Sequence, residues 1–153
     1  MVSLVVIVIM GLGMNLITFS LFGDNPLYCQ GAVENANIAR VIYPEWTARF
    51  YVAQDVPKKY IEEIEDYGAE VVRCEKKNSY DGLNWRFRPL NDPDVHYWIS
   101  RDADSRLSWR ERNAVDEWME SDKSAHLLRD CHNHGYTIMA GMFGINNKLF
   151  HER

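Results

Sequence analysis

The chain has 153 residues, enough for a single domain with its own hydrophobic core. It carries 17 basic and 22 acidic residues, a formal net charge of −5, so it lacks the electrostatic footprint of a nucleic-acid-binding protein. Aromatic residues make up 12% of the chain, which argues against intrinsic disorder. Its three cysteines form no Cys-x-x-Cys pair, so we expect neither a structural zinc site nor a disulfide framework.

An uncharged apolar run over residues 2–23 permits two interpretations. As a helix it is long enough to span a bilayer, which predicts membrane association through these residues. However, no Lys or Arg precedes the run, Gly11-Leu-Gly13 interrupts it, and its Val and Ile content favours strands. We therefore expect an apolar extension or extra strand over 1–14, followed by one domain over 15–153. This organisation predicts a cytoplasmic protein, membrane-associated only if the run acts as an anchor.

Strands and helices alternate in the first half of the chain. The elements expected from periodicity and capping are strands over 15–21, 46–53 and 69–73, a helix from Pro26 to about Ile42 with Asn25 as N-cap, and a helix from Pro57 to Gly68. This βαβαβ order predicts a parallel sheet with right-handed crossovers. The stretch 74–94 is expected to be a solvated loop with an aromatic plug. A phosphate contact by Arg86 or Arg88 is the alternative there, because guanidinium groups pair with phosphates.

A buried strand over Val95 to Ile99 should end where charged residues begin, which leaves Asp102 and Asp104 in the loop at its carboxyl end. Ligands bind at this edge in open α/β sheets. Residues i and i+2 of an extended segment point the same way, so both carboxylates can face one hard cation such as Mg²⁺ or Mn²⁺. A solvated turn with the same residues is the alternative.

The rest of the chain predicts one further helix and one further strand. Ser108-Trp-Arg-Glu111 fits a capping box that begins a helix ending near Glu120. A strand is expected over 126–130. The two histidines of His132-Asn-His134 are interpreted as loop residues rather than metal ligands, because histidine serves many roles.

Two segments resemble small GT-A type nucleotide-sugar glycosyltransferases of viral and bacterial polysaccharide loci. They are Asn15-Leu-Ile-Thr-Phe-Ser-Leu-Phe-Gly-Asp-Asn-Pro-Leu-Tyr28 and Ile99-Ser-Arg-Asp-Ala-Asp-Ser-Arg-Leu-Ser-Trp-Arg-Glu111, the latter with Ala114-Val-Asp-Glu-Trp118 after it. Arg129-Asp130 and Gly141-Met-Phe-Gly144 resemble a later strand and a Gly-rich turn on the acceptor side. The resemblance covers roughly residues 15–145. It implies a GT-A-like three-layer α/β sandwich with a mostly parallel sheet, incomplete at the C-terminus because such chains are usually longer.

The resemblance implies a metal-dependent glycosyltransferase that moves a sugar from a nucleoside-diphospho-sugar donor to a glycan or other hydroxyl acceptor. Its Mn²⁺ or Mg²⁺ would be held by Asp102 and Asp104 and would neutralise the leaving diphosphate. The substrate-binding residues it implies are Phe22 and Gly23 near the nucleotide, Arg86 and Arg101 at the diphosphate, and Gly141 on the acceptor side. Asp130 is the candidate general base.

Two other functions fit the same residues. A phosphohydrolase would use Asp102 as nucleophile and Asp104 as acid, but such enzymes usually place this pair after the first strand. Here three βα elements precede the strand that carries the pair, and this order favours the transferase. The third interpretation is a non-catalytic remnant that binds sugar nucleotides or glycans.

Overall fold

One six-stranded sheet forms the centre of the computed structural model, which describes residues 13–78, 80–129 and 135–152. The strands are β1 (Met14–Leu21), β2 (Thr47–Ala53), β3 (Glu70–Cys74), β4 (Val95–Arg101), β5 (Ala125–Leu127) and β6 (Met142–Asn146). The helices are α1 (Pro26–Ile42), α2 (Lys58–Asp66), α3 (Asp81–Asn84), α4 (Trp109–Met119) and α5 (Asn147–His151), with a 3₁₀ helix η1 (Trp85–Asn91) directly after α3.

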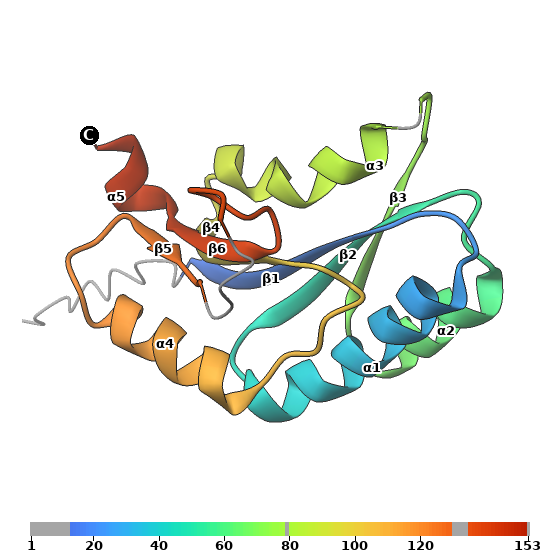
Figure 1. The fold of residues 1–153 in the computed structure, drawn as a ribbon, viewed down its shortest axis with the longest axis horizontal. Coiled ribbons are helices and arrows are strands. Elements are labelled where there is room, and N and C mark those ends of the chain that lie inside the picture. Colours follow the sequence, from blue (N-terminus) through green and yellow to red (C-terminus); the bar gives the residue numbers. More distant parts are fainter. Residues whose placement is uncertain (1–12, 79, 130–134, 153) are drawn as a thin grey trace, which may run out of the picture.

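The strand order in the sheet is β3-β2-β1-β4-β6-β5. Strands β1 to β4 are parallel, and β6 runs antiparallel to both β4 and β5. The helices α1, α2 and α4 lie on one face of the sheet, and α3, η1 and α5 lie on the other (Figure 1). This arrangement is a three-layer α/β sandwich with a mostly parallel sheet, so the predicted fold class is confirmed.

Local signals placed the elements of the first half correctly. The side chain of Asn25 accepts a hydrogen bond from the Leu27 N–H at 3.0 Å, and Pro26 occupies the first turn of α1. After α2, Gly68 has a φ of +81°, a left-handed conformation that glycine adopts readily at a helix end. The capping box at Ser108 is also present at the start of α4.

The central strand β1 is buried on both faces because its side chains alternate between two cores. Ile17, Phe19 and Leu21 face the larger core under α1 and α2, where the Phe19 ring stacks on Phe50 at 4.5 Å. Leu16 faces the opposite side and joins a smaller core with Trp98 under η1. The strand therefore contributes side chains to both cores.

The expectation of a solvated loop over 74–94 is wrong for residues 81–91. Residues from 81 to 91 form α3 and η1, which cover the second face of the sheet. The backbone of Arg86 is tied to β1, since its N–H donates to Ser20 Oγ at 3.2 Å and its carbonyl accepts from Thr18 Oγ1 at 2.9 Å. These partners are distant in sequence, so a local pattern could not indicate them.

Other bounds differ from expectation near the C-terminus. Strand β4 continues two residues further, to Arg101, because Ser100 and Arg101 are buried by contacts with later parts of the chain. Strand β5 spans only 125–127, and α5 forms where the sequence predicted no element. Met142 to Gly144 belong to strand β6 and not to the Gly-rich turn that the resemblance implied. Residues 130–134 of the expected strand and histidine loop lie outside the described residues.

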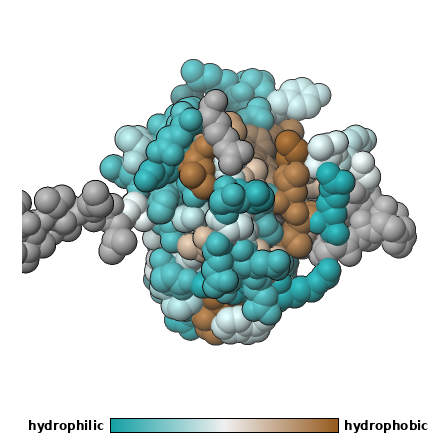
Figure 2. Space-filling model, turned by 90° about the vertical axis from the view of Figure 1, so that its left-hand side faces the viewer, coloured by the Kyte–Doolittle hydropathy of each residue, from teal (hydrophilic) through white to brown (hydrophobic). Residues whose placement is uncertain are grey.

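The end of the molecule that carries β5 and α5 shows hydrophobic residues among hydrophilic ones at its surface (Figure 2). No helix in the described ranges is long and apolar enough to cross a membrane. Residues 14–21 of the apolar N-terminal run form strand β1, which confirms the strand expected over 15–21. The rest of that run through residue 12 lies outside the described residues.

Candidate functional site

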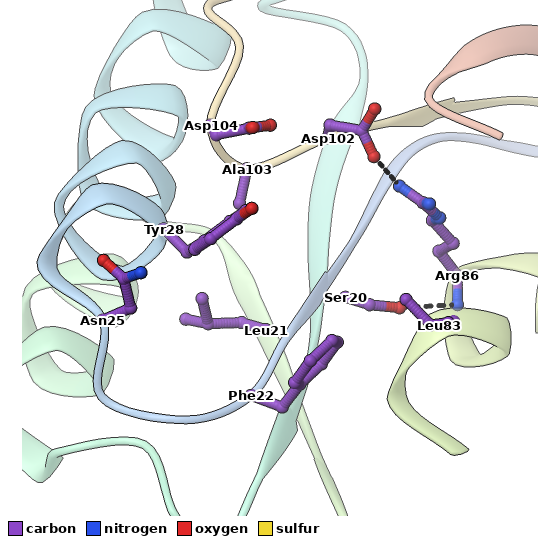
Figure 3. Close-up of a pocket in the computed structure, with 10 residues that line it drawn as sticks. All are labelled: Ser20, Leu21, Phe22, Asn25, Tyr28, Leu83, Arg86, Asp102, Ala103 and Asp104. Carbon is purple, nitrogen blue, oxygen red and sulfur yellow. Dashed lines mark hydrogen bonds and ion pairs between the residues drawn. The ribbon is translucent and has the colours of Figure 1, made fainter. Parts of the chain in front are cut away.

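A cavity of about 490 Å³ opens at the carboxyl ends of β1 and β4. These two strands are neighbours, but the chain moves from β1 outward to β3 and then returns to the other side of β1 to form β4. Such a reversal of strand order is where open α/β sheets bind ligands. The cavity is lined by Ser20, Leu21, Phe22, Asn25, Tyr28, Leu83, Arg86, Asp102, Ala103 and Asp104 (Figure 3).

The loop after β4 is held against α1 by a side chain that sequence reasoning missed. Asn35 is fully buried in α1, and its Nδ2 donates to the carbonyls of Ser105 at 2.7 Å and Ala103 at 3.4 Å. Its Oδ1 accepts from the Leu107 N–H at 3.0 Å. A buried amide whose groups are all paired fixes the backbone that it contacts. One signal was available, because an asparagine within the small-residue face of a predicted helix indicates a polar contact there.

The same loop requires a glycine in α1. A Cβ added at Gly31 would overlap the carbonyl oxygen of Ala103. Helix and loop backbones therefore approach more closely than any side chain allows. This contact and the Asn35 hydrogen bonds together set the position of the segment from Asp102 to Ser105.

Both predicted metal-ligating carboxylates line the cavity, on either side of the buried Ala103. The Asp102 side chain is 44% exposed and forms an ion pair with Arg86 Nη1. That nitrogen also donates to the Arg101 carbonyl at 3.2 Å, while the Arg86 residue is only 8% exposed. The cavity therefore contains two accessible carboxylates, and the one of Asp102 is paired with a buried guanidinium (Figure 3).

The donor set fits a hard cation that keeps open positions. Among the described residues, no group of three or more His, Cys, Asp or Glu side chains could hold a metal by itself. Two carboxylates with phosphate oxygens and water are the ligands that Mg²⁺ prefers. Gly141 leaves room for the Asp102 carboxylate, because a Cβ at residue 141 would overlap that carboxylate. The predicted residue Gly141 thus lies directly against one of the predicted ligands.

Phe22 lines the cavity at the end of β1, and the next residue, Gly23, does not line it. The Phe22 ring lines the cavity and packs against Gly82, and the Lys76 ammonium lies 5.6 Å from the ring centroid. The Gly23 N–H donates to Asp55 Oδ1 at 2.8 Å, and Asp55 is also paired with Lys76. Partial burial alone would raise the pKa of Asp55, but the Lys76 ammonium and the Gly23 N–H hold it below its ordinary value. This carboxylate therefore stays charged beside the β1–α1 turn.

Arg101 does not reach the cavity. It is 3% exposed, and its Nε donates to Glu111 Oε1 at 2.8 Å while its Nη1 donates to the carbonyls of Ser100 and Phe143. The ion pair connects the end of β4 to the first turn of α4. Asp130, the predicted general base, lies outside the described residues. Asn25, Tyr28 and Leu83 also line the cavity, although the sequence analysis predicts no ligand contact for them.

Comparisons with known proteins define the fold class. No family model matches the chain, and no curated protein matches it. A solved structure of the mannosyltransferase PcManGT from Pyrobaculum calidifontis, in complex with GDP-Man and Mn²⁺, matches with a TM-score of 0.56 and 13% identity over 89% of this chain and 46% of that one. An active-site mutant of LgtC matches with a TM-score of 0.52 and 12% identity over 92% of this chain and 60% of that one.

These likenesses show that the chain has the fold of GT-A type glycosyltransferases, as the sequence resemblance implied. The chain spans between 46% and 60% of the length of the two solved structures. At these identities, the fold is what the comparisons establish.

Proposed function

We propose that the chain is a metal-dependent glycosyltransferase unit that uses a nucleoside-diphospho-sugar donor and a glycan or other hydroxyl acceptor. One observation carries the proposal: two accessible carboxylates, Asp102 and Asp104, share a cavity with the buried guanidinium of Arg86 at the reversal of strand order. A diphosphate with its cation matches this charge pattern, because the cation takes the carboxylates and the guanidinium takes phosphate oxygens. The GDP-Man and Mn²⁺ held by a protein of the same fold support this assignment.

Each residue of the cavity has a part in this proposal. Asp102 and Asp104 hold Mn²⁺ or Mg²⁺, which when bound neutralises the charge that develops on the leaving diphosphate. Arg86, which is ion-paired with Asp102 in this structure, donates to the diphosphate. The first turn of α1 adds the positive end of a 17-residue helix at Asn25. Phe22 presents its ring to the nucleotide.

The remaining predicted residues act at the edges of the donor site. Gly23 turns the chain beside the nucleotide, and Gly141 keeps the acceptor side open next to Asp102. Arg101 contributes by holding the end of β4 against α4, which positions Asp102. Asp130 is proposed to accept the proton of the acceptor hydroxyl.

Calorimetric titration of UDP and GDP, each with and without Mn²⁺, tests the donor site. The chain offers a matched pair of variants, because Asp92 and Asp94 have the same spacing and precede β4 at the other end of the strand. We expect Asp102→Asn/Asp104→Asn to lose at least about tenfold in Mn²⁺-dependent nucleotide affinity, and Asp92→Asn/Asp94→Asn to retain it. Equal loss in both variants, or no nucleotide binding by the natural chain, would refute the proposed donor site.

Turnover then separates the competing functions. Release of GDP or UDP from sugar nucleotides in the presence of Mn²⁺ and an acceptor is the expected result. Hydrolysis of simple phosphomonoesters without sugar-nucleotide turnover would identify a phosphohydrolase instead. Donor binding without any turnover would identify a binding remnant.

A further inference from the structure

Arg86 is held in the wall of the cavity by its backbone and its surroundings. Its N–H and carbonyl are both bonded to hydroxyls of β1, and the residue is 8% exposed. A guanidinium cannot lose its proton in a protein, so its charge is present whether or not a ligand is bound. A buried charge without a partner is strongly unfavourable. The cavity wall therefore requires an anion opposite Arg86 at all times.

Asp102 supplies that anion through the ion pair with Arg86 Nη1. The pairing leaves Arg86 incompletely satisfied, since its buried Nε has no hydrogen-bond partner among the described residues. Asp102, by contrast, is 44% exposed and is one of the two carboxylates that face the cavity. The guanidinium thus has donor capacity left for another anion, and the carboxylate is accessible to a cation.

We propose that Arg86 and the divalent cation compete for the carboxylate of Asp102, and that the diphosphate of the nucleotide resolves the competition by pairing with Arg86. This inference rests on the proposed function and adds the coupling between its two ligands. In the free protein Arg86 serves as the internal counter-ion of Asp102 and weakens binding of the cation alone. When a diphosphate binds, Arg86 donates to phosphate oxygens, and Asp102 becomes free to join Asp104 around the cation.

Thermodynamic linkage makes this coupling reciprocal. The nucleotide strengthens cation binding by the same factor by which the cation strengthens nucleotide binding. A shared metal–phosphate contact also couples the two ligands, so coupling alone does not identify Arg86. The distinguishing quantity is the affinity for the cation in the absence of nucleotide. Removing the Arg86 charge raises this affinity only if Arg86 obstructs the cation site in the natural chain.

Titration of Mn²⁺ alone, followed by the electron paramagnetic resonance signal of free Mn²⁺, measures this quantity. The variant is Arg86→Met, which fills the same space without the charge. The matched control is Arg88→Met, which makes the same charge change on the same short helix, where the guanidinium contacts Cys74 and the ring of Tyr51 instead. Circular dichroism confirms folding of each variant, and Arg86→Gln replaces Arg86→Met if the latter does not fold.

We expect Arg86→Met to bind Mn²⁺ alone about tenfold more tightly than the natural chain, within the usual range of coupling between sites. Arg88→Met should change that affinity by no more than about twofold, because solvent screens a more distant charge. The inference is overturned if Arg86→Met leaves the Mn²⁺ affinity unchanged or if both variants raise it equally. Those results would leave the donor site standing if Asp102→Asn/Asp104→Asn still abolishes Mn²⁺-dependent nucleotide binding. Absence of Mn²⁺ binding under every condition would overturn both proposals.

Discussion

Helix propensity and the tertiary structure predict opposite effects of Gly31→Ala on stability. The sign of the measured change therefore shows which of the two dominates. Gly31 lies within α1, and alanine in a helix interior is about 1 kcal/mol more favourable than glycine. In this structure the new Cβ would overlap the carbonyl oxygen of Ala103 and would lie 2.7 Å from Arg106 Nη1. The arginine can move away, but the carbonyl belongs to the backbone that Asn35 holds. Helix and loop must therefore separate.

The expected magnitude follows from two opposing contributions. Forcing extra volume into a packed contact costs about 1–3 kcal/mol, and weakening the hydrogen bonds of Asn35 adds about 1 kcal/mol or more. After the gain in helix propensity, Gly31→Ala should lower the free energy of unfolding by about 1–3 kcal/mol. For a domain of this size that corresponds to a decrease of roughly 3–10 °C in Tm.

Urea unfolding followed by tryptophan fluorescence measures this change, and the five tryptophans provide the signal. Gly135→Ala is the control, since an added Cβ there meets no atom of the described residues within 4 Å. Its free energy of unfolding should stay within about 0.5 kcal/mol of the natural chain. If Gly31→Ala is as stable as the natural chain or more stable, the close approach of α1 to the loop is refuted.

Three further changes test the surroundings of the site. Asn35→Ala should lower the free energy of unfolding by about 2–3 kcal/mol in urea, because it leaves buried backbone groups of the loop unpaired; a loss below about 0.5 kcal/mol would contradict this role. Gly141→Ala should weaken Mn²⁺ binding in the presence of nucleotide about tenfold, as measured by calorimetry, and should leave Tm nearly unchanged. The reason is that the new Cβ displaces the flexible, half-exposed side chain of Asp102. Unchanged affinity would argue against Asp102 as a metal ligand. Burial, together with the nearby positive charge of Arg101, lowers the pKa of His126 to about 4. Between about pH 6.5 and pH 4 the unfolded chain therefore binds more protons than the folded chain, and the free energy of unfolding falls as the pH decreases through that range. Between pH 7 and pH 5, the free energy of unfolding of His126→Gln should fall by about 1 kcal/mol less than that of the natural chain, with allowance for solvent screening of this partly buried ring. Equal decreases in the two proteins would place the His126 ring in solvent.

Local rules determined much of this fold because the groups involved lie within a few residues of one another. The N-cap at Asn25 acts on Leu27, the capping box joins Ser108 to Glu111, and Gly68 ends its helix by its own backbone freedom. The alternation of strands and helices in turn limited the sheet to a mostly parallel topology. The sequence also placed Asp102 and Asp104 just beyond a central strand, which is where the structure has them.

The tertiary structure decided the contacts between groups that are far apart in the chain. The ion pair between Arg86 and Asp102 spans 16 residues, and the hydrogen bond from Asn35 to Ser105 spans 70. The segment from 74 to 94 read as a loop because its helices are stabilised by the sheet face that they cover rather than by a periodic pattern of their own. Arg101 has a side chain that commonly contacts phosphate, but the packing of β4 against α4 buries it in an ion pair with Glu111. The sequence by itself therefore determined the alternating elements of the first half, the strand before the two carboxylates and the helix after them. Only packing decided that residues 81–91 form helices and which side chains face the cavity.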